Sequence, residues 1–165
     1  MKIRRLTPLN AETYLALRLE ALQNNPEAFG SSYEEEKDQP IEKYIHRFQS
    51  SDSITLGAFV DTQLVGVVTL FRENLAKLHH RANIIAMYVS PTQRGLGIGK
   101  SLLVEAIQQA NDWAGVEQVY LTVVTTNTPA KKLYASLGFE VFGTEKRALK
   151  VGETYFDEEH MVLFL

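Results

Sequence analysis

The sequence predicts an α/β protein built on a mixed sheet. Residues 54–60 and 64–71 are strand-like apolar runs on either side of the polar turn Asp61-Thr62-Gln63, which predicts a β-hairpin. Residues 102–110 repeat apolar side chains at helical spacing, shortly after a strand-like run at 84–89. Strands followed by a helix and then a strand–helix–strand unit indicate an α/β architecture.

The N-terminal part is predicted to hold one short strand and two helices. The strand covers residues 3–6, and Asn10 suits the N-cap of a first helix that ends at 24–26. The apolar positions of this helix are Leu15, Leu19 and Leu22. Residues 27–39 are predicted to be a loop, and Pro40 opens the second helix. The apolar positions of the second helix are Ile41, Tyr44, Ile45 and Phe48.

The rest of the chain is predicted to alternate strands and helices. Thr128 is expected to cap a short helix that has Pro129 at its first position and stops at Gly138. The other predicted elements are, in order, a charged connection (72–81), the central strand (83–89), a helix (97–111), a buried strand (116–124) and two final strands (139–144 and 154–165).

Composition excludes several classes of function. The net charge is −3, so a basic footprint for nucleic acid is not expected. The chain has no cysteine, which excludes disulfides, thiolate metal sites and an acyl-cysteine intermediate. No cluster of acidic or histidine residues has metal-ligand spacing, so no metal is expected. The 165 residues fit a single domain over residues 1–165.

Neither a targeting segment nor a membrane span is expected. The basic residues within 1–5 are followed by no apolar stretch of the kind found in signal peptides. The longest apolar runs, such as 65–71 and 161–165, are far too short to cross a bilayer. We therefore expect a cytoplasmic protein with no membrane partner and no nucleic-acid partner.

The most informative stretch is rich in glycine and joins the central strand to the helix that follows it. It reads Arg94-Gly95-Leu96-Gly97-Ile98-Gly99-Lys100-Ser101. Glycines let the backbone approach an anion, and the first free N–H groups of a helix point at it. Lys100 and Ser101 fall in the first helical turn and can add donors. The stretch predicts a phosphate-binding loop.

Two common phosphate loops do not fit the spacing. The nucleotide P-loop requires glycine five residues before the glycine of Gly99-Lys100-Ser101, and that position is Arg94. The dinucleotide fingerprint G-x-G-x-x-G requires glycine at Lys100 if it begins at Gly95, or at Leu102 if it begins at Gly97. The ligand is therefore expected to be a phosphate compound of another class.

The loop resembles the signature of the GCN5-related N-acetyltransferase (GNAT) family. Arg94-x-x-Gly97-x-Gly99 matches the Q/R-x-x-G-x-G/A pattern that binds the pyrophosphate of acetyl-CoA in that family. The preceding Met-Tyr-Val-Ser-Pro (87–91) is similar to the family's central strand. Residues 126–139 resemble the family segment N-x-x-A-x-x-x-Y-x-x-x-G-F, in the same order along the chain. The resemblance covers most of the chain.

The resemblance implies a GNAT-type fold: a mixed, mostly antiparallel sheet flanked by helices, with central strands that splay to form an acetyl-CoA slot. It implies acetyl-CoA as co-substrate, with the pantetheine arm against the strand residues Met87, Tyr88 and Val89. It also implies a cofactor contact for Asn127, which in addition suits a helix cap. Tyr134 is implied to bond the CoA sulfur and protonate the leaving thiolate.

Several residues are candidates for the general base. A lysine-like amine costs roughly 4.6 kcal/mol to deprotonate at pH 7. Some family members use a glutamate on the central strand, but Asn83 occupies that position here. We select His80, because an imidazole titrates near physiological pH. The other candidates are His79, Glu73, Asp157 and His160. A water chain, or an amine whose pKa is lowered by desolvation, would need no such residue.

The predicted function is transfer of the acetyl group of acetyl-CoA to a primary amine of a small molecule or peptide by direct attack. The alternative is a CoA-binding sensor without turnover, which the absence of an obvious base favours. Residues 34–36 form a Glu-Glu-Glu run that could attract a cationic acceptor, although a solvated face is expected. The resemblance also allows a homodimer. The acceptor has no signature in the sequence.

Overall fold

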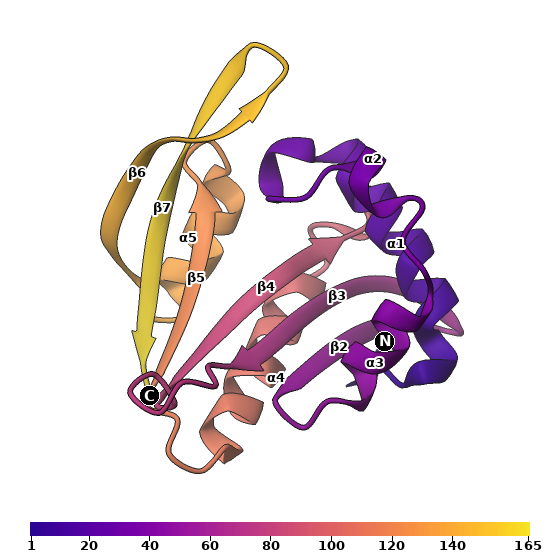
Figure 1. Ribbon diagram of the computed structural model, residues 1–165, viewed down its shortest axis with the longest axis horizontal. Helices are drawn as coiled ribbons and strands as arrows, with labels where there is room; N and C mark the ends of the chain where they lie inside the picture. Colours follow the sequence, from indigo (N-terminus) through magenta and orange to yellow (C-terminus); the bar gives the residue numbers. More distant parts are fainter.

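The computed structural model describes residues 1–165, and one seven-stranded sheet runs through it in the order β1-β2-β3-β4-β5-β7-β6 (Figure 1). Neighbouring strands are antiparallel except β4 and β5, which are parallel. This arrangement confirms the mixed, mostly antiparallel sheet flanked by helices. The strands are β1 (Lys2–Arg5), β2 (Ser53–Val60), β3 (Gln63–Arg72), β4 (Arg81–Val89), β5 (Gln118–Val124), β6 (Glu140–Val151) and β7 (Thr154–Phe164).

Helices cover both faces of the sheet (Figure 1). Apolar side chains of α4 and α5 belong to one buried cluster, and those of α1 and α3 belong to a second cluster on the opposite face. None of the helices is long and apolar enough to cross a membrane. The helices are α1 (Ala11–Asn24), α2 (Tyr33–Glu36), α3 (Glu42–Gln49), α4 (Ile98–Asp112) and α5 (Thr128–Ser136), with short 3-10 turns η1 (Pro8–Asn10), η2 (Pro26–Ala28) and η3 (Pro91–Gln93).

The buried stripe of α1 differs from the prediction. Leu15 and Leu19 are only half-buried, whereas Tyr14 and Leu17 are buried in the second apolar cluster. Tyr14 and Leu17 are three residues apart, so they also share one face of a helix. The larger aromatic ring takes the core position because it packs against Tyr44 and Phe48 of α3.

Residues 27–39 were predicted to be a loop, but they contain the short helix α2. Its start is a capping box: the Glu35 amide donates to Ser32 Oγ at 3.2 Å, and Glu35 Oε2 accepts from the Ser32 amide at 2.8 Å. The Ser-x-x-Glu spacing was visible in the sequence and predicts such a start. The prediction of a loop was therefore wrong for residues 33–36, where this cap starts a short helix within a charged run.

Two boundaries in the C-terminal half also differ. Asn127, not Thr128, is the N-cap of α5, since its Oδ1 accepts a hydrogen bond from the Ala130 amide at 3.3 Å. Strand β6 was predicted to end at residue 144 but continues to Val151. It pairs with β7 as a long hairpin that projects beyond the rest of the sheet (Figure 1). Most side chains on β6 are exposed, so no alternating apolar pattern marked the extension.

Candidate active site

The two parallel strands at the centre of the sheet separate after a short contact. β4 and β5 pair only at Arg81–Asn83 with Gln118–Tyr120, and the remaining residues of both strands diverge (Figure 1). The ladder between β3 and β4 shifts register between Val67 and Thr69, and Ala86 has a positive φ of 52°. This bulge bends β4 away from β5. A small cavity of about 70 Å³ lies at the split and is lined by both strands.

The glycine-rich loop presents free backbone donors. Gly95 and Gly97 have φ angles of +77° and +76°, which other residues rarely adopt, and α4 begins directly afterwards at Ile98. No side chain caps this helix, and the amides of residues 95–100 form no hydrogen bond within the protein. Free amides at a helix N-terminus are a binding site for an anion.

A cavity of about 500 Å³ lies between this loop, the end of β4 and the start of α5. It is lined by most of the residues predicted to bind acetyl-CoA: Met87, Tyr88, Val89, Arg94, Gly95, Gly97, Ile98, Gly99, Lys100, Asn127 and Tyr134. Two predicted residues do not line it. Leu96 is 68% exposed, and Ser101 Oγ donates to the Gly97 carbonyl at 3.1 Å, inside the loop.

Arg94 ties the loop to two other elements. Its Nε donates to the Val89 carbonyl at 2.9 Å, and its Nη2 donates to Asn25 Oδ1 at 2.9 Å, just past the end of α1. The guanidinium also lies 5.5 Å from the centre of the Tyr88 ring. Arg94 therefore holds β4, the loop and α1 in one arrangement, in addition to lining the cavity.

Close packing brings α4 next to β4. A side chain at Gly99 would begin 3.2 Å from Met87 Cε, which is closer than ordinary van der Waals contact, so little space separates the two elements here. The Tyr88 hydroxyl donates to Glu20 Oε1 of α1 at 2.9 Å. Of the predicted strand residues, Met87 also lines the small cavity at the split.

Tyr134 lies where the small cavity meets the large one and lines both. Only 7% of the residue is exposed, and its hydroxyl makes no hydrogen bond within the protein. Burial raises the pKa of Tyr134 to about 12, so the phenol keeps its proton at neutral pH. A protonated hydroxyl without a partner can donate to a group that enters the split. Asn127 lines both cavities as well and caps α5.

A third cavity, of about 480 Å³, lies on the other side of the split. We call it the acceptor-side cavity. Its walls come from the helices α1, α2 and α3, the turn before α2, and the strands β3 to β7. Ala28 and Phe29 line all three cavities. Among the candidate bases, only His160 lines it, whereas His79, His80, Glu73 and Asp157 line none of the three.

Three candidate bases that lie outside the cavity occupy other hydrogen-bonded positions in the fold. His80 precedes β4, and its carbonyl accepts hydrogen bonds from the amides of Glu117 and Gln118. Glu73 Oε1 accepts from Asn83 Nδ2 at 2.9 Å. Asp157 accepts from the Arg147 amide at 2.8 Å and from Lys146, which lowers its pKa.

Glu158 is a titratable residue of the acceptor-side cavity that the sequence analysis did not identify. It lies opposite Val124 on β5, and His160 lies opposite Thr122. Burial and the nearby Glu145 carboxylate raise the pKa of Glu158, although His160 opposes the shift. Residues two apart on a strand share a face, so Glu158 could have been found from its spacing to His160.

His160 is held by both ring nitrogens. Nδ1 lies 3.2 Å from Thr122 Oγ1, and Nε2 lies 3.3 Å from Glu145 Oε2. Because each nitrogen already has a partner, His160 has less freedom than Glu158 to accept a proton from a molecule in the cavity. The Glu158 carboxylate forms no hydrogen bond or ion pair within the protein.

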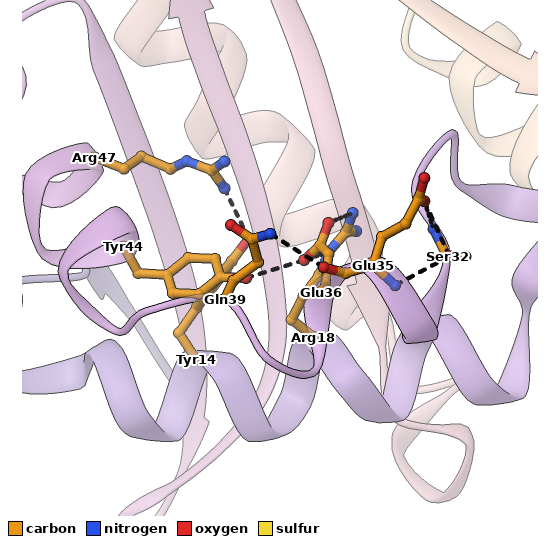
Figure 2. A network of polar contacts seen from close by, with 8 residues as sticks. All are labelled: Tyr14, Arg18, Ser32, Glu35, Glu36, Gln39, Tyr44 and Arg47. Atoms are coloured by element: carbon orange, nitrogen blue, oxygen red, sulfur yellow. Dashed lines mark hydrogen bonds and ion pairs between the residues drawn. The ribbon is translucent and has the colours of Figure 1, made fainter.

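A buried polar network forms the wall of the acceptor-side cavity on the side of the N-terminal helices. Figure 2 shows Glu36 between Arg18 and Tyr44. Arg18 donates to both carboxylate oxygens at 2.9 and 3.1 Å, and the Tyr44 hydroxyl donates at 3.0 Å. Burial opposes ionisation of Glu36, yet these contacts lower its pKa to about 2. The expectation of a solvated Glu34–Glu36 face was therefore wrong for Glu36, which is 6% exposed.

The comparisons with known proteins agree with this geometry. A model of the acetyltransferase (GNAT) family matches residues 18–139. The L-amino acid N-acetyltransferase AaaT of Escherichia coli (strain K12) is 34% identical over 107 residues, which cover 64% of this chain and 65% of that protein. Streptothricin acetyltransferase of Escherichia coli is 37% identical over 99 residues, which cover 57% of this chain and 51% of that protein.

The fold also matches solved structures. A putative acetyltransferase, yncA from Salmonella typhimurium, solved with its cofactor acetyl-CoA, superimposes with a TM-score of 0.87 at 17% identity, over 100% of this chain and 94% of that one. At this identity the likeness shows the fold. The family match covers most of the sequence and includes the glycine-rich loop and the α5 segment. The chain therefore belongs to the acetyltransferase (GNAT) family, which confirms the resemblance found in the two motifs.

Proposed function

We propose that this protein is an acetyl-CoA-dependent N-acetyltransferase acting on a primary amine. The observation that carries the proposal is that two large cavities lie on either side of the β4–β5 split, where a small third cavity is lined by the unbonded Tyr134. One cavity carries free backbone amides suited to a pyrophosphate, and the other carries titratable side chains suited to an amine. Family membership supports the same function.

Acetyl-CoA would bind in the cavity of the glycine-rich loop. The amides of residues 95–100 would hold its pyrophosphate, and Lys100 would add a positive charge. The pantetheine arm would lie along the edge of β4 that β5 leaves unpaired after Asn83. The thioester would then lie at the split, next to Tyr134. A relative of the same fold solved with acetyl-CoA supports this choice of co-substrate.

The amine would enter from the acceptor-side cavity and lose a proton to Glu158. Deprotonation at pH 7 costs about 1.4 kcal/mol for an α-amine of pKa near 8 and about 4.6 kcal/mol for a lysine-like amine. A carboxylate with a raised pKa is a better base than an ordinary one. We therefore place Glu158 ahead of His80, which does not line the cavity.

The nitrogen lone pair attacks the thioester carbonyl, the C–N bond forms and the C–S bond breaks. The CoA thiolate, whose conjugate acid has a pKa near 8.5, leaves beside Tyr134. Because the pKa of Tyr134 is about 12, complete proton transfer from the phenol to this thiolate is uphill. Tyr134 therefore acts first as a hydrogen-bond donor to the developing thiolate. The thiolate then takes the phenol proton, and solvent returns a proton to the phenol.

The direct test measures free thiol released from acetyl-CoA in the presence of a panel of primary amines. We expect amine-dependent thiol release and a product heavier by one acetyl group. Glu158→Gln is expected to lower kcat by about 10²–10⁴-fold and to remove the acidic limb of its pH profile. Glu153→Gln, an exposed residue near the hairpin turn, is the matched control.

Two results would contradict the proposal. Acetyl-CoA binding without thiol release over the whole panel would indicate a sensor rather than an enzyme. Normal turnover and an unchanged pH profile in Glu158→Gln would remove Glu158 from the mechanism and leave the base to water or to another residue.

A further inference from the structure

Arg81 is a positively charged group in the acceptor-side cavity without a partner. It is the first residue of β4, and its guanidinium lies 4.1 Å from the centre of the Tyr120 ring. Its Nε is buried and has no hydrogen-bond partner, and its guanidinium forms no ion pair. Arg81 also lines the acceptor-side cavity, and its other guanidinium nitrogens form no hydrogen bond within the protein, so they are free to bind a ligand that supplies acceptors.

The position of the Arg81 guanidinium over the Tyr120 ring suits one kind of ligand. A guanidinium that lies over an aromatic ring keeps its N–H groups in its own plane, free at the edge. That edge matches the two oxygens of a carboxylate in a bidentate pair. Tyr120 itself is held in place, because its hydroxyl donates to Gln118 Oε1 at 3.1 Å and its ring meets Phe142 edge-on at 5.6 Å.

The other charges of the acceptor-side cavity agree with an anionic ligand. Lys43 and Arg47 of α3 line it and form no ion pair, although Arg47 donates to the Tyr14 hydroxyl. The charge of Arg18 is already balanced by Glu36. Glu158 is therefore the one unpaired acid in the wall, against three unpaired cations. A polycationic acceptor such as a polyamine would meet repulsion there.

We propose that the acceptor carries a carboxylate, which Arg81 binds while the acceptor's amine reacts near Glu158. The inference rests on the proposed acetyl transfer and narrows its substrate class. Tyr120, beneath Arg81, and Val124, opposite Glu158, are four residues apart on β5, a rise of about 13 Å. Because of this separation, the test includes acceptors with several bonds between the amine and the carboxylate as well as α-amino acids.

The test compares matched acceptors that differ only in the carboxylate. Glycine, glycylglycine and 6-aminohexanoate are each assayed beside their C-terminal amides by thiol release from acetyl-CoA. For the acceptor pair with the highest turnover, we expect kcat/KM to be higher for the acid than for its amide. In Arg81→Met this acid-to-amide ratio should fall about 10- to 100-fold, the loss expected for a charge-assisted bidentate contact. Arg81→Lys should recover part of the ratio, because lysine keeps the positive charge but lacks the two parallel N–H donors of a guanidinium.

Arg72→Met is the matched control. Arg72 also has a buried Nε without a partner and lies 5.3 Å from an aromatic ring, that of Trp113, but it lines none of the three cavities. Its substitution should leave the acid-to-amide ratio unchanged. A fall of the ratio in Arg72→Met equal to that in Arg81→Met would show a general effect of losing a positive charge and would overturn the proposal.

A binding measurement separates this inference from the proposed function. N-acetylglycylglycine and its amide are titrated by calorimetry into protein saturated with CoA. Preference for the acid that is lost in Arg81→Met supports the carboxylate site even if no acceptor of the panel is acetylated, in which case only the proposed function fails. Equal binding, absent binding, or an acid preference that survives in Arg81→Met overturns the carboxylate site.

Discussion

At the scale of single residues, Tyr134 is distinguished by a buried hydroxyl that has no hydrogen-bond partner. The side chain is buried and meets Phe139 edge-on at 6.1 Å, yet the hydroxyl has no partner in the protein. Removing that hydroxyl leaves no other group unsatisfied, so its loss should affect chemistry more than folding. Tyr134 is therefore a residue at which catalysis and stability can be separated.

Tyr134→Phe should lower kcat by about 10²–10⁴-fold, because the developing thiolate loses its donor. The affinity for acetyl-CoA, measured by calorimetry, should change much less. Tyr155→Phe removes an exposed hydroxyl on the β6–β7 hairpin and is the control for a general loss of activity. Unchanged turnover in Tyr134→Phe would exclude the residue from the mechanism.

At the scale of elements, the turn from β4 into α4 creates the anion site. The positive φ angles of Gly95 and Gly97 turn the chain so that several amides face one cavity, and α4 aligns its first N–H groups with them. A side chain at Gly97 would meet no atom within 4 Å, so the space beside it is open. A charge introduced there would therefore act on a ligand rather than on the packing.

Gly97→Asp should weaken acetyl-CoA binding by at least about 100-fold in calorimetry, because a carboxylate would repel the pyrophosphate. Gly97→Ala introduces the backbone strain without the charge. This strain costs about 1–2 kcal/mol of folding stability at a positive φ. Gly115→Asp is the control, because it introduces the same negative charge and the same backbone strain at a φ of +83°, away from the loop and outside the cavities. Normal CoA binding in Gly97→Asp would contradict the assignment of the loop.

At the scale of the whole molecule, one ion pair joins the N-terminal helices over the sheet. Arg18 of α1 and Glu36 of α2 pair at 2.9 Å, with side chains 11% and 8% exposed, and Tyr44 of α3 donates to the same carboxylate (Figure 2). Breaking one partner of such a buried pair leaves the other charge uncompensated. The pair therefore helps to hold in place the wall of the acceptor-side cavity.

Glu36→Gln should lower the free energy of unfolding at pH 7 by about 3–5 kcal/mol in urea titrations. The pKa of Glu36 falls from 4.5 to about 2 on folding, so the wild-type stabilisation is complete above pH 4.5 and is lost as the pH falls toward 2. The two proteins should therefore converge in stability over that range. Glu34→Gln, in an exposed pair with Lys37, should change little at any pH. A constant difference between pH 7 and pH 2.5 would contradict this account.

Local patterns predicted most of the elements but not every boundary. The Asp61–Gln63 turn and the helix after the glycine loop lie where they were predicted, because each depends on neighbours in the chain. The apolar positions predicted for α1 include Leu22, which is buried, but not Tyr14. The rings that pack against Tyr14 belong to α3, and a local period in α1 cannot reveal them. The extension of β6 was missed because hairpin pairing, not burial, holds it.

The sequence by itself determined the fold class, the family and the two motifs of the proposed donor site. The anion loop and the segment from Asn127 to Tyr134 are contiguous, so spacing alone defines them. Only the tertiary structure decided the acceptor side. Its charges come from α1, α2, α3, β4 and β7, and Arg81 and Glu158 lie 77 positions apart in the chain. Which charges remain unpaired depends on packing between such distant segments, and a pattern in one segment does not record it.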